Sequence, residues 1–86
     1  MKTYEMEKIV ESMNYLKSLN PLSFDELKEL LTIYDKDEDY CDFYYDIPET
    51  DFVLEGSFYK NENGEICNAN NYTLLDNEKN TIMEIE

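Results

Sequence analysis

The sequence contains no histidine, arginine or tryptophan, and it has only two glycines, two prolines and two cysteines. Without histidine, general acid–base chemistry would fall to carboxylates or tyrosines. Two isolated glycines, Gly56 and Gly64, cannot build a glycine-rich phosphate loop, and no base stands beside either cysteine to activate a nucleophile. A pair of catalytic carboxylates needs a deep cleft, which a chain of 86 residues rarely builds. The sequence therefore predicts a protein that is not an enzyme and uses no cofactor.

Long apolar runs are absent as well. The chain opens with MKTYEMEKIVES, which is charged and amphipathic and does not have the apolar region of a signal peptide. Cys41 and Cys67 stand far apart and form no C-x-x-C pair. We therefore expect a cytoplasmic protein, in a host bacterial cell, with reduced thiols and no membrane-spanning segment.

Positive charge is scarce. Twenty-one acidic residues stand against seven lysines, so the formal net charge is −14. Such a charge disfavours direct binding to nucleic acid or to an anionic membrane, keeps a chain monomeric, and favours a basic protein surface as the partner. The hydrophobic content of 42% and the aromatic content of 14% favour a single folded domain over residues 1–86 rather than a disordered acidic tail.

The hydrophobic pattern predicts an α+β fold. Apolar residues recur at spacings of three and four over residues 4–19, and a second helix begins at a capping box in which Ser23 is followed by Glu26. That second helix should run to about Tyr34, and the short Asn20-Pro21-Leu22 link should fold the two helices into an N-terminal helical hairpin over residues 1–34.

The second half of the chain has the period of a β-sheet. Residues 51–60 alternate. One face holds Phe52, Leu54, Gly56 and Phe58, and the other holds Val53, Glu55, Ser57 and Tyr59. An Asn-Gly turn follows at residues 61–64. Three further short strands are expected at residues 65–69, 72–75 and 81–85. We thus predict that the helical hairpin packs on an antiparallel three- to four-stranded β-meander over residues 51–86, with residues 35–50 as an acidic, aromatic segment that could add an edge strand at residues 39–47.

The segment YDKDEDYCDFYYDIPETD, residues 34–51, concentrates the charge. Residues 35–55 hold nine acidic residues and one lysine, a net of −8. In an extended strand, residues two apart repeat every ~6.6 Å, close to the ~6.8 Å that two nucleotides rise along one DNA strand. Interleaved tyrosines supply rigid contact area at low entropic cost. The predicted partner-binding residues are Asp35, Asp37, Glu38, Asp39, Tyr40, Asp42, Tyr44, Asp46, Glu49 and Asp51.

Calcium binding is an alternative use of the same carboxylates. The first, third, fifth and twelfth positions of an EF-hand-like loop are occupied by Asp35, Asp37, Asp39 and Asp46. The pattern fails where Tyr40 replaces the required glycine and where Pro48 would break an exit helix, so we assign no metal ligand. A degenerate EF-hand-like domain, an acidic interaction module of unknown role and a plain solvated face remain open.

The clustered acids of residues 35–51, the aromatics between them and the small size of the chain resemble the acidic DNA-mimic inhibitors of phages and mobile elements, of the anti-CRISPR and anti-restriction type. The resemblance is one of composition and assigns no residue a role. It implies an inhibitor that occupies the DNA-, RNA- or PAM-binding surface of a basic protein, such as a Cas effector or a restriction-type enzyme, and so blocks nucleic-acid binding.

Overall fold

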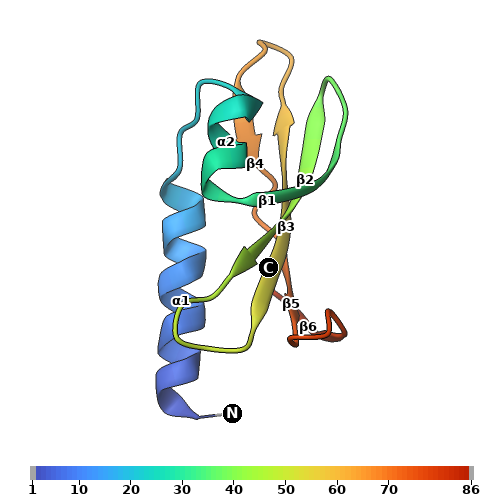
Figure 1. The fold of residues 1–86 in the computed structure, drawn as a ribbon. Helices are drawn as coiled ribbons and strands as arrows, with labels where there is room; N and C mark the ends of the chain where they lie inside the picture. The colour runs from blue at the N-terminus through green and yellow to red at the C-terminus, as the bar shows by residue number, and fades with distance from the viewer. Residues whose placement is uncertain (1, 86) are drawn as a thin grey trace.

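The computed structural model describes residues 2–85 and contains two helices and six strands (Figure 1). In chain order the elements are α1 (Thr3–Ser18), α2 (Phe24–Leu30), β1 (Thr32–Lys36), β2 (Tyr40–Asp46), β3 (Val53–Lys60), β4 (Ile66–Asn68), β5 (Tyr72–Leu75) and β6 (Thr81–Ile85). Neither helix combines the length and the apolar character that a membrane span needs in the described part of the chain.

The prediction of a helical hairpin on a three- to four-stranded meander is wrong. The second helix does begin where the capping box predicts, since the Ser23 side chain accepts a hydrogen bond from the Glu26 amide at 3.3 Å. It ends after only seven residues, and Leu31 already has extended backbone angles. Residues 32–36 form β1 instead of a third helical turn. The β-branched and aromatic residues Thr32, Ile33 and Tyr34 suit a strand that pairs with a neighbour.

All strand pairs in the sheet are antiparallel, and the strand order is β1-β2-β3-β5-β6. Residues 40–46 form a strand, β2, close to the expected residues 39–47. The expectation that it is an edge strand is wrong, because β2 lies between β1 and β3. The predicted turn at residues 61–64 is confirmed: Gly64 has a φ of +78°, a region that glycine adopts without strain. A break at Asn70, with φ +66°, separates β4 from β5, and both of these strands pair with β3.

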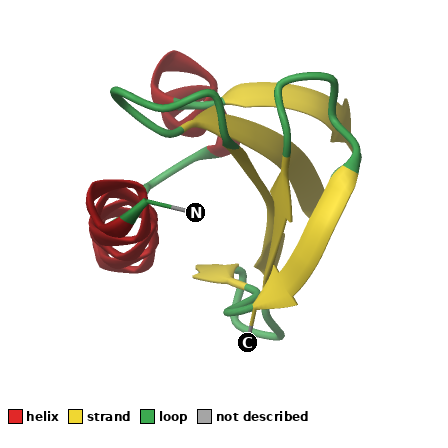
Figure 2. Cartoon of the chain, turned by 90° about the horizontal axis from the view of Figure 1, so that it is seen from below, coloured by secondary structure: helices red, strands yellow, loops and turns green. Residues whose placement is uncertain are grey.

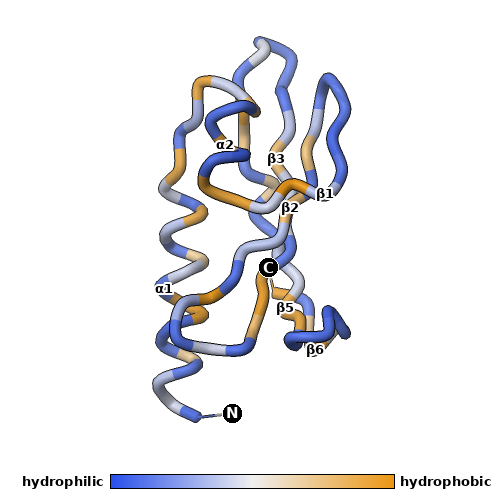
Figure 3. Tube along the Cα trace, viewed as in Figure 1, coloured by the Kyte–Doolittle hydropathy of each residue, from blue (hydrophilic) through white to orange (hydrophobic). Residues whose placement is uncertain are grey.

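The helices cover one face of the sheet, which forms an arc beside α1 when the molecule is viewed end-on (Figure 2). The core lies between α1 and this face. Its fully buried side chains, from α1, α2, β2, β3 and β5 and the loop after β2, are Leu16, Leu27, Cys41, Phe43, Ile47, Leu54, Phe58 and Leu74. By contrast, the turns between β1 and β2 and between β3 and β4 are strongly hydrophilic (Figure 3).

Candidate functional site

The sheet face that points away from the helices carries a row of tyrosines and carboxylates, and we call it the outer face. Side chains alternate between the two faces of a strand. Because Cys41 and Phe43 of β2 are buried in the core, their neighbours Tyr40, Asp42 and Tyr44 point to the opposite side. Strand pairing adds residues from the neighbouring strands. The outer face comprises Tyr34, Asp35, Tyr40, Asp42, Tyr44, Asp46, Glu55, Ser57, Tyr59, Thr73 and Glu84.

An irregularity in β1 brings two residues to this face instead of one. Ile33 pairs with Phe43 on the core side, whereas the next paired residue, Asp35, lies opposite Asp42 on the outer side. Tyr34 is the extra residue between them. Its ring stacks on that of Tyr44, with 4.2 Å between the ring centroids and 19° between the planes. The bulge thus adds both an aromatic ring and a carboxylate to the outer face.

A polar hollow of about 350 Å³ lies on the outer face. Three carboxylates from three different strands line it: Asp42, Glu55 and Glu84. The Ser57 hydroxyl donates a hydrogen bond to Asp42 across the β2–β3 pair. Partial burial and the neighbouring carboxylates of Glu55 and Asp42 raise the pKa of the Tyr34 phenol well above its ordinary value of 10.0. The hollow is therefore an environment of concentrated negative charge.

Lysines are segregated from this face. Of the seven lysines, Lys8 and Lys17 lie on α1, Lys28 lies on α2, and Lys2 directly precedes α1. Two further lysines are the last residues of strands and point toward the helices. The Lys36 ammonium lies 3.8 Å from Asp25, and the Lys60 ammonium lies 5.2 Å from the centre of the Phe24 ring. The remaining one, Lys79, lies over the Tyr44 ring with 5.1 Å between its ammonium nitrogen and the ring centre. Lys79 is thus the lysine that lies over the outer face itself, whereas Lys28 and Lys36 line a hollow with Tyr34 and Asp35 at the β1 edge of the sheet.

Within residues 2–85, the ion pairs join Lys8 to Glu11, Lys8 to Glu49, and Lys36 to Asp25. None of these pairs uses a carboxylate of the outer face. The negative charges of Asp35, Asp42 and Glu55 are consequently not neutralised by an ion pair inside the described chain.

The predicted partner-binding residues divide into three groups. Five of them lie on the outer face: Asp35, Tyr40, Asp42, Tyr44 and Asp46. The turn between β1 and β2 holds Asp37, Glu38 and Asp39, and these line a second hollow of about 410 Å³ together with Lys36 and Lys60. Residues 35–39 therefore do not form one extended strand with carboxylates at regular spacing, because the chain reverses there.

The third group lies at the other end of β2. Glu49 and Asp51 belong to the loop that joins β2 to β3, and the Glu49 carboxylate lies 3.8 Å from Lys8 on the helix-bearing side. The seven residues of β2, at about 3.3 Å each, separate this loop from the β1–β2 turn by roughly 20 Å. The acidic segment is thus spread along the molecule, and of its predicted residues only Asp35 and those of β2 belong to the outer face.

Several outer-face residues were not among those predicted. The alternation of residues 51–60 placed Glu55, Ser57 and Tyr59 on one face, and this signal could have added them to the site. Tyr34 and Glu84 reach the outer face through a bulge and through the pairing of β6 with β5, and the sequence carries no local signal for either.

The EF-hand-like spacing is not realised as a loop. Asp35 lies in β1 and Asp46 at the far end of β2, so the four aspartates are distributed over two strands and a turn. In residues 2–85, no three or more Asp, Glu or Cys side chains are grouped so that they could hold a metal ion.

Comparisons with known proteins returned no match: neither the protein-family models, nor the curated proteins, nor the solved structures contain a significant relative of this chain. The geometry and the charge of the outer face are consequently the features that indicate a function.

Proposed function

We infer that this protein is a non-enzymatic inhibitor that imitates nucleic acid: its outer face binds the basic DNA-, RNA- or PAM-binding surface of a bacterial defence protein, such as a Cas effector, inside the cytoplasm. The observation that carries the proposal is the segregation of charge. Carboxylates and tyrosines share one sheet face, and six of the seven lysines lie elsewhere. A charge excess that served only solubility would have no reason to be sorted in this way.

The spacing of the carboxylates supports the imitation of a phosphate backbone. Asp42 and Asp46 lie on the same face of β2, four residues apart, which corresponds to about 13 Å in an extended strand. Four nucleotides rise about 14 Å along one strand of duplex DNA. A groove whose lysines and arginines normally neutralise phosphates could accept these carboxylates in the same register.

The tyrosines give this surface an energetic role beyond charge. Three large aromatic side chains are left exposed to solvent: Tyr34, Tyr40 and Tyr59 expose 46%, 38% and 43% of their surface. Aromatic rings of this type carry much of the binding energy at protein interfaces, whereas surrounding charges chiefly raise the association rate. We therefore expect a high association rate constant that falls as the salt concentration rises.

The test compares two variants with equal net charge. In the first, Asp35→Asn, Asp42→Asn and Glu55→Gln remove three charges from the outer face. Purified Cas effectors and restriction enzymes are assayed for DNA binding in the presence of each variant. We expect the parent protein to block at least one of them and the outer-face variant to lose at least about tenfold in affinity, because each lost charge-assisted contact removes roughly 1–3 kcal/mol.

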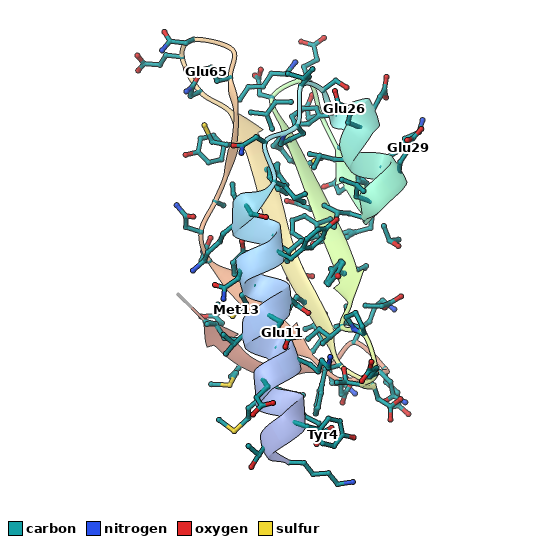
Figure 4. The ribbon with its side chains drawn as sticks, turned by 90° about the vertical axis from the view of Figure 1, so that its left-hand side faces the viewer. Tyr4, Glu11, Met13, Glu26, Glu29 and Glu65 are labelled. Atoms are coloured by element: carbon teal, nitrogen blue, oxygen red, sulfur yellow. The ribbon has the colours of Figure 1, made fainter. Side chains whose placement is uncertain are left out.

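The matched control removes three charges from the helices by Glu7→Gln, Glu26→Gln and Glu29→Gln; Figure 4 shows Glu26 and Glu29 on α2. This control should inhibit as well as the parent protein. Equal losses in both variants would mean that net charge and not the outer face is responsible. A parent protein that inhibits none of the enzymes tested would overturn the proposed function.

A further inference from the structure

The single lysine of the outer face is held there by a well-defined turn. Lys79 lies in the turn between β5 and β6 and has a φ of +66°. The Asp76 carboxylate accepts hydrogen bonds from the amides of Glu78 and Asn80, at 2.9 and 2.8 Å, and the Lys79 amide donates to the Asp76 carbonyl oxygen at 3.0 Å. These bonds fix the backbone from which the Lys79 side chain reaches β2.

The Tyr44 ring receives neighbours from both sides of its strand. Tyr34 approaches from β1 and stacks on the ring, whereas Lys79 approaches from the β5–β6 turn and places its ammonium group over it. Glu55 lies directly opposite Tyr44 in the β2–β3 pair. The surface thus already holds a cation, and that cation belongs to the protein itself.

We propose that the stacked pair Tyr34–Tyr44, with Glu55, is the seat for an arginine guanidinium of the partner, and that Lys79 is an internal cation which the guanidinium displaces. The inference rests on the proposed function, whose partner chemistry it specifies. Arginine suits the seat better than lysine does. The planar guanidinium stacks on aromatic rings, is less strongly hydrated than an ammonium group, and can pair with a carboxylate through two hydrogen bonds.

Because Lys79 occupies the place of the partner's guanidinium group, it weakens the binding of that group to the Tyr44 ring. An exposed ammonium over a tyrosine ring is held by a weak attraction, so an incoming guanidinium can replace it. Removing the Lys79 charge should free the ring and strengthen the binding of an arginine-rich ligand beyond the effect of the charge alone.

The experiment measures the binding of an oligoarginine peptide to the full chain by calorimetry at low salt. Lys79→Met is compared with Lys17→Met, which makes the same charge change on the exposed surface of α1. We expect the Lys79 variant to bind about two- to fivefold more tightly than the Lys17 variant, the factor expected for one exposed cation–π contact. Resonances of the Tyr34 and Tyr44 rings, followed by nuclear magnetic resonance, should shift on addition of the peptide.

A second variant, Lys79→Arg, keeps the charge in the turn and strengthens the stacking, so it should bind the peptide no more tightly than the parent protein. Equal affinities for the Lys79→Met and Lys17→Met variants, with ring shifts confined to the outer face, would overturn the role of Lys79 and leave the docking surface intact. Shifts confined to the helices would instead overturn the outer face as the binding surface, and the proposed function with it.

Discussion

Asp35 and Asp42 lie directly opposite each other in the β1–β2 pair, with both side chains on the outer face. Like charges at directly opposed positions of an antiparallel pair destabilise the sheet by about 0.2–1 kcal/mol. Ser57 donates a hydrogen bond to Asp42, but no lysine of the described chain forms an ion pair with either carboxylate. This arrangement lowers the stability of the isolated protein, and a cationic partner would remove the repulsion.

Replacing Asp35 by Asn should therefore stabilise the protein, by about 0.2–1 kcal/mol at low salt. The control is Asp46→Asn, on the same sheet face but opposite the apolar Val53, where a smaller gain is expected. Urea denaturation of the two variants and the parent protein gives the free energies of unfolding. The advantage of the Asp35 variant should shrink in concentrated salt, since the ions screen the repulsion. A loss of stability in this variant would contradict the interpretation.

The substitution Gly56→Ala should destabilise the protein. A Cβ atom at Gly56 would lie 2.8 Å from the Phe43 ring and 3.0 Å from the Tyr72 ring, and both rings are buried in the core. Overpacking of this kind typically lowers the free energy of unfolding by about 1–3 kcal/mol. In a double-mutant cycle, Phe43→Leu should restore part of the space, so that the two changes together lose less stability than their sum. Strictly additive losses would show that the Phe43 ring is not the obstacle.

The Tyr34 phenol should ionise at a higher pH than an ordinary tyrosine. Partial burial and the carboxylates of Glu55 and Asp42 raise its pKa in the folded state, so the neutral phenol stabilises the fold and this contribution is lost as the pH rises above 10.0. In an ultraviolet titration, Tyr34→Phe should remove a late phenolate transition. Glu55→Gln should move the same transition to lower pH. An unchanged titration in both variants would show that Tyr34 does not respond to these carboxylates.

The turn that carries Lys79 should weaken in acid. Hydrogen bonds from backbone amides lower the pKa of Asp76 below its ordinary value of 3.8. The ionised carboxylate therefore stabilises the folded state above that pH, and this contribution disappears as the pH falls further. Asp76→Asn keeps an acceptor oxygen but does not titrate, so the stability of the parent protein should fall relative to this variant below pH 3.8. Parallel stability curves down to the lowest pH would contradict the assignment.

The parts of the fold that depend on strong local patterns could be predicted from the sequence. The amphipathic helix at the N-terminus, the start of α2 at Ser23, the alternation of β3 and the turn ending at Gly64 all appear close to the expected positions. The segment from Thr32 to Tyr34 was assigned to a helix, although it belongs to strand β1. It continues a helical pattern of leucines, and only its pairing with β2 makes it a strand.

The site could be predicted only in part, for the same reason. Five of the ten expected residues lie on the outer face, and those five are the ones in or directly beside β2. The residues of the β1–β2 turn and of the β2–β3 loop have similar composition, but the strand between them separates the two ends. Glu84 contributes to the site although it lies far from residues 35–51 in the chain.

The sequence by itself determined the excess of negative charge, the scarcity of cations and the alternation that gives β2 and β3 a polar side and an apolar side, because composition and strand period are local properties. Only the tertiary structure decided that Asp35 opposes Asp42, that Tyr34 stacks on Tyr44 and that Lys79 reaches across the sheet to the same ring. These relations depend on the register of strands and on a bulge, which arise from contacts between residues distant in the chain.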